Sequence, residues 1–319
     1  MIVLWRITER CNFACGFCAY DRRLSGARRE VNPSVVERFG EVLGDYRRQT
    51  GDRVLLSWLG GEPLLWRPIF EISQRLRDRH GIELSATTNG SRLHLAETRH
   101  GIVQTFSELT ISVDGLMEFH DRVRGSPGGW LQMREGISML VRERNARNMT
   151  LKLRANTVLM RDNIENFAAL CRELATWRVD EITFNPLGGR DRPEFFPDHA
   201  LRSEDVAKLS EILPTLKTEL ASRGVRLCGT ARYLQRIEAS AWQRELSVSD
   251  CEPGESFLFV DESGRIAPCS FTSDRYGIPV EEVVDVRELP SRYRSLRADQ
   301  QAAACKDCKS NHVFGKFVH

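Results

Sequence analysis

The sequence lacks a long apolar run, an excess of charge of one sign, and any repeated or low-complexity tract. Its 46 Lys and Arg residues balance 44 Asp and Glu residues, which gives a formal net charge of +2. A nearly neutral chain gives no electrostatic reason to expect a nucleic acid or a membrane surface as a partner. No apolar run approaches the roughly 20 residues of a membrane-spanning helix, and the first residues lack the regions of a signal peptide. We therefore expect a cytoplasmic protein.

Cysteine, by contrast, is plentiful. The chain has nine cysteines among 319 residues. In a reducing compartment they are poor candidates for disulfides and better candidates for metal ligands or free thiols. The rest of the composition, 41% hydrophobic and 28% charged residues, is that of a globular protein and excludes a disordered or coiled-coil chain.

Strand-like and helix-like patterns alternate through the first two thirds of the chain. They predict strands over 2–8, 54–58, 84–87, 109–113, 151–159, 181–184 and 224–227, and helices over 33–46, 66–79, 94–103, 130–143, 164–174 and 204–220. Such βα units imply a parallel sheet with helical crossovers, either an open doubly wound sheet or a partial barrel. In both folds ligands bind at the carboxyl ends of the strands.

The pattern changes near residue 247. A hairpin is predicted over 257–268, and at most a short helix over 284–296. A segment of this size is rarely stable through apolar burial alone and usually needs a bound metal or another cross-link. We expect a first domain over 1–230, a linker helix over 231–249 and a small domain over 250–319.

Three cysteines lie close together directly after the first predicted strand. Cys11, Cys15 and Cys18 have the spacing CxxxCxxC. Three thiolates on a tight loop can bind three corners of an iron–sulfur cube and leave one iron open, whereas four cysteines are the general rule. A zinc site would need a fourth ligand, and no His or Cys stands between Cys18 and His80. Zinc with a distant ligand is the alternative.

With Gly60-Gly61-Glu62-Pro63 at the end of the second predicted strand, the sequence resembles the radical S-adenosylmethionine (radical SAM) superfamily, which has CxxxCxxC and GGEP motifs. The resemblance implies an α/β partial (β/α)6 barrel, a [4Fe–4S] cluster on the three cysteines, and SAM. One electron from the cluster would cleave SAM, and the resulting 5′-deoxyadenosyl radical would abstract a hydrogen atom from the substrate. Glu62 and the backbone of Gly60 and Gly61 would hold the methionyl ammonium. Two further stretches, 87–90 (TTNG) and 120–125 (HDRVRG), are similar to the TNG and HDxxRG stretches of this family.

The same resemblance implies further SAM contacts. Phe17 would lie against the adenine, with Tyr20 close by. Ser112 and Arg154 would meet the SAM carboxylate or ribose, and Asn89 would line the site. Asn89 could instead only shape a turn, and Arg154 could be an ordinary ion-pair residue.

Four further cysteines gather in the predicted small domain. Cys251, Cys269, Cys305 and Cys308 can complete a cube or a tetrahedral zinc site. The pattern resembles the twitch subgroup, whose domain is a truncated SPASM domain, and implies one fully ligated auxiliary [4Fe–4S] cluster. Such a cluster would accept or relay an electron and make the net reaction an oxidation. Zinc is again the alternative.

The two remaining cysteines differ from each other. Cys171 lies among apolar residues of a predicted helix and is expected in the core. Cys228 directly follows the last predicted strand, where some radical SAM epimerases carry a thiol that returns a hydrogen atom to the substrate. A buried structural thiol is the alternative for Cys228. Candidate general bases for an oxidation lie in the loop after the sixth strand, namely Glu194, Asp198 and His199.

The resemblance favours a radical SAM oxidoreductase. Its substrate would be a natural-product precursor, either a peptide side chain or a sugar or cyclitol alcohol, and a flavodoxin- or ferredoxin-type protein would supply electrons. A redox-neutral epimerase that uses Cys228 is the alternative enzyme. A zinc-binding scaffold is the alternative without catalysis.

Overall fold

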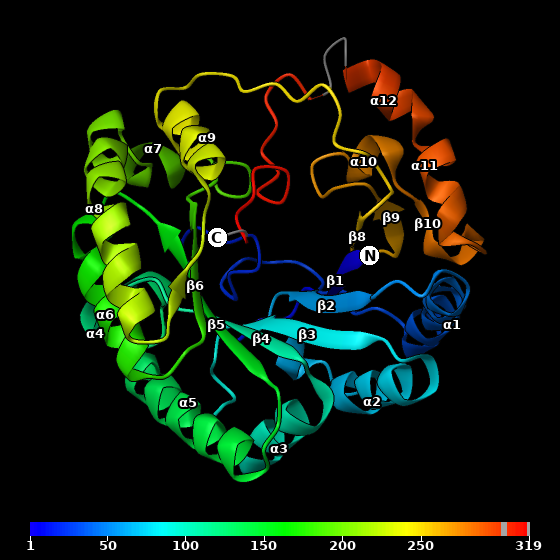
Figure 1. Ribbon diagram of the computed structural model, residues 1–319, viewed down its shortest axis with the longest axis horizontal. Coiled ribbons are helices and arrows are strands. Elements are labelled where there is room, and N and C mark those ends of the chain that lie inside the picture. Colours follow the sequence, from blue (N-terminus) through cyan, green and yellow to red (C-terminus); the bar gives the residue numbers. More distant parts are fainter. Residues whose placement is uncertain (301–304, 318–319) are drawn as a thin grey trace.

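The computed structural model describes residues 1–300 and 305–317. Strands β1 to β7 follow one another in a curved sheet, and each pairs in parallel with the next (Figure 1). They are β1 (Ile2–Thr8), β2 (Leu55–Gly60), β3 (Glu83–Thr88), β4 (Glu108–Ser112), β5 (Lys152–Leu159), β6 (Glu181–Pro186) and β7 (Arg226–Leu227). Helices cover the outer face of the sheet. The prediction of an α/β partial barrel is confirmed.

The crossover helices are close to those that the sequence predicts. They are α1 (Pro33–Thr50), α2 (Ile69–His80), α3 (Ala96–Thr105), α5 (Gly129–Ala146), α6 (Phe167–Thr176) and α8 (Ser203–Ser222). The signals at the ends of α1 are local: Asn32 accepts a hydrogen bond from the Ser34 amide at 3.1 Å, and Gly51 ends the helix with φ of 76°. No helix in the described part of the chain is both long and apolar enough to cross a bilayer.

Two α-helices between β1 and β7 were not predicted. α4 (Met117–Arg124) overlaps the HDRVRG stretch, and α7 (Phe196–His199) is a single turn. Both are too short to show a helical period in the sequence. The one available signal for α4 was Gly125, which follows it with φ of 58°.

The alternating residues of each strand divide the molecule into an apolar layer and a polar interior. Trp5 and Trp58 point outward, and their rings lie 6.3 Å apart, with Phe39 of α1 at 5.7 Å from Trp5. The alternate residues of β5, among them Arg154 and Asn156, face the inside of the barrel, which is therefore polar. The core lies between the sheet and the helices.

The C-terminal part extends the same sheet. After α9 (Ala231–Ala241), strand β8 (Phe257–Val260) pairs in parallel with the outer edge of β1 and antiparallel with β9 (Arg265–Ala267), which carries β10 (Ile278–Pro279). The predicted hairpin is thus present. Short helices α10 (Ser273–Tyr276), α11 (Leu289–Arg292) and α12 (Arg294–Gln300) follow. The division at residues 230 and 250 stays a prediction, because both sides of it share one sheet.

The last described residues return to the centre of the barrel. Residues 311–317, called the inserted turn here, lie inside the ring of strands (Figure 1). The Thr230 hydroxyl donates to the Phe314 carbonyl at 3.0 Å, and Phe314 is 2% exposed. Sequence patterns gave no sign that this segment enters the barrel.

A buried ion pair joins the carboxyl ends of β4 and β5 to α4. The Asp114 carboxylate accepts from Arg124 Nε at 2.7 Å and from the Val158 amide at 2.8 Å. The Asp114 side chain is fully buried and that of Arg124 nearly so. Arg124 is thereby fixed at the edge of the sheet where ligands bind in such folds.

The variant Asp114→Asn removes one charge of this pair and leaves Arg124 charged and buried. We expect the free energy of unfolding, measured by urea titration, to fall by about 3 kcal/mol. The control is Glu219→Gln, which breaks the exposed pair of Arg172 and Glu219 and should leave the unfolding midpoint essentially unchanged. Equal decreases in the free energy of unfolding for the two variants would show that the buried Asp114–Arg124 pair stabilises the fold no more than the exposed pair does.

Candidate functional site

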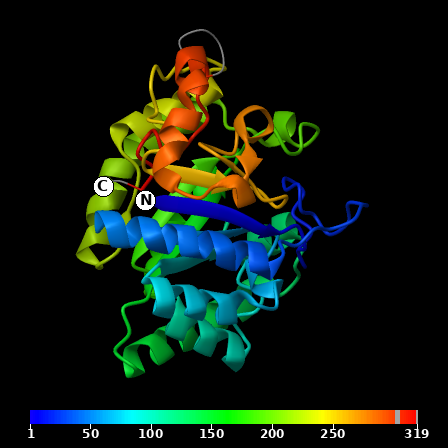
Figure 2. The ribbon, with the colours of Figure 1, turned by 90° about the vertical axis from the view of Figure 1, so that its right-hand side faces the viewer.

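The CxxxCxxC cysteines lie on the loop between β1 and α1, called the cysteine loop here (residues 9–31). Figure 2 shows this loop at the carboxyl end of β1, together with α7. Cys11 Sγ accepts from the Phe13 amide at 3.5 Å and lies 3.7 Å from Asn89 Nδ2, and Cys18 Sγ accepts from the Tyr20 amide at 3.4 Å. Donors aimed at sulfur favour its thiolate form, which is the form that binds metal.

The chemistry of these three thiols fits a cube held through three irons. Burial, opposed by the charge of Arg124 and assisted by the neighbouring Cys18 and Cys11, raises the pKa of Cys15 to about 12, so metal binding must displace a proton. Among the described residues, no three Cys, His, Asp or Glu side chains converge as the ligands of a single ion do. A [4Fe–4S] cluster takes each thiolate on a different iron and needs no such convergence.

The GGEP turn packs directly under the cysteine loop. The amides of Gly61 and Glu62 donate to the carbonyls of Thr8 and Arg10, each at 2.7 Å. A Cβ on either Gly60 or Gly61 would overlap one of those carbonyl oxygens, and Gly60 has φ of 128°. Both glycines are therefore required by the close approach of two backbones. The Gly61 and Glu62 amides are engaged in these hydrogen bonds, and the role of the Gly60–Gly61 backbone toward the methionyl ammonium stays a prediction.

The Glu62 carboxylate is fully buried and receives three hydrogen bonds. The donors are the Leu64 amide at 3.0 Å, the Thr88 hydroxyl at 2.8 Å and the Asn89 amide at 2.7 Å. Burial raises the pKa of Glu62, and these hydrogen bonds oppose the rise. No ion pair of this carboxylate is formed among the described residues. A ligand ammonium would supply the missing positive charge.

The remaining predicted SAM contacts surround the cysteine loop. The Asn89 amide group donates to Asn12 Oδ1 at 2.9 Å, so it links the end of β3 to the loop. Phe17 lies 5.6 Å from the Arg124 guanidinium. Tyr20 lies 5.9 Å from that of Arg6. The structure thus brings Phe17, Tyr20, Glu62 and Asn89 to one end of the barrel, and their roles toward SAM stay predictions.

Ser112 and Arg154 lie at different depths inside the barrel. Ser112, the last residue of β4, is opposite Asn156. Arg154 lies further from the carboxyl ends, where it pairs with Glu181 at 2.6 Å and with Glu108 at 3.2 Å. Its charge is already balanced by two carboxylates, which favours the ion-pair role over contact with SAM.

The four C-terminal cysteines come together around Cys308. Burial, together with the charges of the nearby Cys305, Cys269 and Cys251, raises the pKa of Cys308 to about 11. Cys269 Sγ lies 3.3 Å from the Thr272 hydroxyl. These four thiols, all among the described residues, likewise do not converge as the ligands of a single zinc ion would. A fully ligated cube takes each thiolate on a different iron and is compatible with them.

A buried arginine holds the CxxC segment in place. Arg236 of α9, whose side chain is 3% exposed, forms an ion pair with Asp307 and donates to the Cys308 carbonyl at 3.2 Å. The Cys308 amide donates to the Leu246 carbonyl at 2.9 Å. Arg236 was missed by the sequence analysis because its partner lies far away along the chain.

The other two cysteines are both buried. Cys171 is fully buried in α6, as expected. Cys228 is 1% exposed, and its amide continues the β7 ladder by donating to the Ile182 carbonyl at 2.9 Å. Burial raises the pKa of Cys228 to about 11, so it is a neutral thiol at pH 7. Its role as a hydrogen-atom donor stays a prediction.

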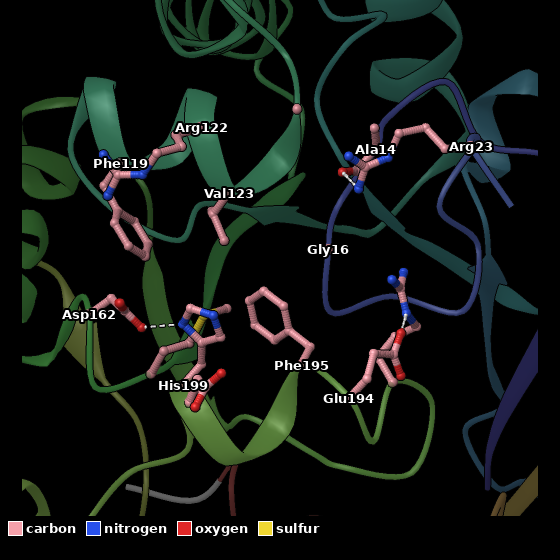
Figure 3. A pocket seen from close by; sticks show the side chains of 14 residues that line it. Ala14, Gly16, Arg23, Phe119, Arg122, Val123, Asp162, Glu194, Phe195 and His199 are labelled. Atoms are coloured by element: carbon pink, nitrogen blue, oxygen red, sulfur yellow. Dashed lines mark hydrogen bonds and ion pairs between the residues drawn. The ribbon is translucent and has the colours of Figure 1, made fainter.

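A cavity of about 530 Å³ opens beside the cysteine loop. Figure 3 shows His199 pointing into it and hydrogen-bonded to Asp162, with Nδ1 and Oδ2 2.7 Å apart. The His199 ring stacks on Phe195, with centroids 3.8 Å apart. The lining includes Gly16 and all three candidate bases, Glu194, Asp198 and His199. The structure therefore places these bases near the cysteine loop.

Comparison with known proteins agrees with the motifs. The model of the Radical SAM superfamily matches residues 5–192, more than half of the chain. Fe-coproporphyrin III synthase of Methanosarcina barkeri is 22% identical over 223 residues, which are 70% of this chain and 53% of that protein. An S-adenosylmethionine-dependent nucleotide dehydratase of Psychrobacter lutiphocae is 30% identical over 124 residues, 36% of this chain and 41% of that protein. The chain thus spans about half the length of these relatives or less.

Solved structures share the fold at low sequence identity. Streptococcus suis SuiB bound to S-adenosylmethionine has a TM-score of 0.68 and 16% identity, over 93% of this chain and 67% of that chain. Native anSMEcpe with bound AdoMet and the Cp18Cys peptide has a TM-score of 0.67 and 16% identity, over 97% and 86%. The family match includes both the cysteine loop and the GGEP turn. The chain belongs to the radical SAM superfamily.

Proposed function

We propose that this protein is a radical SAM oxidoreductase that acts on a natural-product precursor. Family membership implies a [4Fe–4S] cluster and SAM, and Cys11, Cys15 and Cys18 are the ligands proposed for that cluster. The cluster and SAM supply, when bound, a one-electron reduction that yields a radical able to abstract hydrogen from an unactivated C–H bond. The chain's own residues position SAM and exclude water.

One observation carries the proposal. The three-cysteine loop lies on the Gly60–Gly61 turn, and the buried Glu62 carboxylate beside it lacks a positive partner among the described residues. An acceptor of this kind is suited to the ammonium of SAM, next to thiolates that leave one iron open. Glu62 would bind and orient the methionyl group, and Phe17 would face the adenine.

Four clustered C-terminal thiols support an auxiliary [4Fe–4S] cluster as the electron acceptor of a net oxidation. The His199–Asp162 pair beside the cysteine loop supports proton removal from the substrate. SuiB and anSMEcpe have been solved with peptides bound, which supports a peptide precursor over a sugar or cyclitol alcohol. A flavodoxin- or ferredoxin-type donor would approach the exposed arginines of the cysteine loop, such as Arg22 and Arg29.

Iron analysis of two variants separates the two proposed clusters. Wild-type protein reconstituted without oxygen should hold about eight irons per chain. Both Cys15→Ala and Cys308→Ala should hold about four. With dithionite and SAM, however, only Cys15→Ala should lose formation of 5′-deoxyadenosine. Zinc in place of iron, or 5′-deoxyadenosine from Cys15→Ala at the wild-type rate, would overturn the proposal.

Glu62→Gln tests the proposed ammonium site. Loss of a charged hydrogen bond should raise the dissociation constant of SAM roughly tenfold to a hundredfold, as measured by calorimetry on the reconstituted protein. Glu83→Gln, at the opposite end of the sheet, should bind SAM as the wild type does. Unchanged SAM affinity in a Glu62→Gln protein of wild-type iron content would exclude Glu62 from the site.

Arg236→Gln tests how the auxiliary site is held. Without the ion pair to Asp307, the CxxC segment loses its anchor on α9, so we expect about four irons per chain. Formation of 5′-deoxyadenosine should persist. Glu238→Gln, an exposed change on the same helix, should retain the full iron content. A full iron content in Arg236→Gln would show that the anchor is dispensable.

A further inference from the structure

A lysine from the far end of the described chain lies inside the barrel. The inserted turn carries Lys316 between β5 and β6, where its ammonium donates to Asn156 Oδ1 at 2.7 Å and to Asn185 Oδ1 at 3.1 Å. The residue is 8% exposed. Nothing in the proposed handling of SAM uses this group.

No described residue carries a negative charge that pairs with the ammonium of Lys316. Among the described residues, no carboxylate lies within ion-pair distance of its ammonium, and its two acceptors are neutral amides. The charged or titratable groups that face it are Arg154 of β5, which is neutralised by Glu108 and Glu181, and Cys228 after β7. Burial, with a further contribution from Arg154, lowers the pKa of Lys316 to about 7, and Cys228 opposes this shift. Buried cations are normally paired, so this one is suited to an anionic ligand.

Lys316 also lies towards the carboxyl ends of the strands, the end at which ligands bind in barrels of this kind. Its partner Asn156 is opposite Ser112, the last residue of β4, and opposite Thr183 of β6. Asn185 is opposite Val158, closer to the carboxyl ends. The ammonium has three N–H donors and the two asparagines use two of them. One donor is left for a molecule in the barrel.

We infer that Lys316, held by Asn156 and Asn185, binds a carboxylate of the substrate inside the barrel. A hydroxyl would leave the buried charge unbalanced, whereas a carboxylate supplies both the counter-charge and an acceptor. The substrate class is therefore an acidic one, with the carboxylate carried either by a peptide side chain or by a sugar acid. This inference rests on the proposed function and adds the substrate group that the site recognises.

The first experiment measures which small acids bind. The melting temperature of the reconstituted, SAM-bound protein is measured with two pairs of compounds. The peptide-like pair is N-acetylglutamate N-methylamide and its glutamine amide, and the sugar-like pair is glucuronate and glucuronamide. We expect one acid to raise the melting temperature and its amide to leave it unchanged, and the acid that does so identifies a peptide-like or a sugar-like source. The shift should vanish in Lys316→Met and persist in Lys208→Met, a change on the exposed face of α8.

The second experiment does not depend on whether Lys316→Met folds. The protein is acetylated to a trace extent at pH 7.5, and the acetylation of each lysine is measured by mass spectrometry of its peptides. The rate depends on the fraction of that lysine that is present as the neutral amine. The binding acid should slow acetylation of Lys316 about threefold or more, because at pH 7.5 a carboxylate that raises its pKa from about 7 by one unit lowers the fraction of neutral amine about threefold. Acetylation of Lys208 should not change. In the variant Asn185→Asp, the new carboxylate should slow the acetylation of Lys316 to a similar extent when no acid is added.

The proposal that Lys316 binds a carboxylate would be overturned if each acid and its amide had the same effect on the melting temperature and on the acetylation of Lys316. Release of 5′-deoxyadenosine is measured on the same wild-type protein. Its absence would overturn the proposed function, whereas intact release without discrimination between acid and amide would overturn only the role of Lys316.

Discussion

The close approach of the cysteine loop to the end of β2 is the constraint on which the rest of the site depends. Because carbonyls of the loop lie on the amides after Gly60, no side chain fits there, and the loop can lie flat across the carboxyl edge of the sheet. The same turn ends in Glu62, which is thereby buried next to the cysteines. One backbone contact thus sets the distance between the proposed metal ligands and the proposed ammonium acceptor.

Two buried arginines each help to hold a cysteine segment in a fixed position. The cysteine segments are loops, and loops have little apolar surface of their own with which to hold a fixed position. Arg124 accepts the Ala14 amide on its carbonyl at 3.0 Å while its guanidinium pairs with Asp114. Arg236 pairs with Asp307 and donates to the Cys308 carbonyl. In both places a helix residue whose charge is neutralised inside the protein contacts a cysteine segment, Arg124 through its carbonyl and Arg236 through its guanidinium.

The fold and the chemistry-bearing motifs could be predicted because their signals are local. Strand and helix periods, Asn32 before α1, and the spacing of Cys11, Cys15 and Cys18 all lie within a few residues of one another. What could not be predicted depends on distant pairing. Arg154 was expected near SAM, and only the structure shows that carboxylates from β4 and β6 already hold it. Lys316 had no pattern at all, because its place is set by a turn that re-enters the barrel.

The pairing of β8 with β1 has a consequence for biosynthesis. Strand β1 is flanked in the sheet by β2 on one side and by β8 (Phe257–Val260) on the other. Until some 250 residues have been added, one row of β1 amides and carbonyls has no partner in the sheet, and such an open edge invites pairing with other chains. Completion of the barrel is therefore a late, long-range event. A ribosome that stalls before the hairpin would leave a nascent chain prone to aggregate through the open edge of β1.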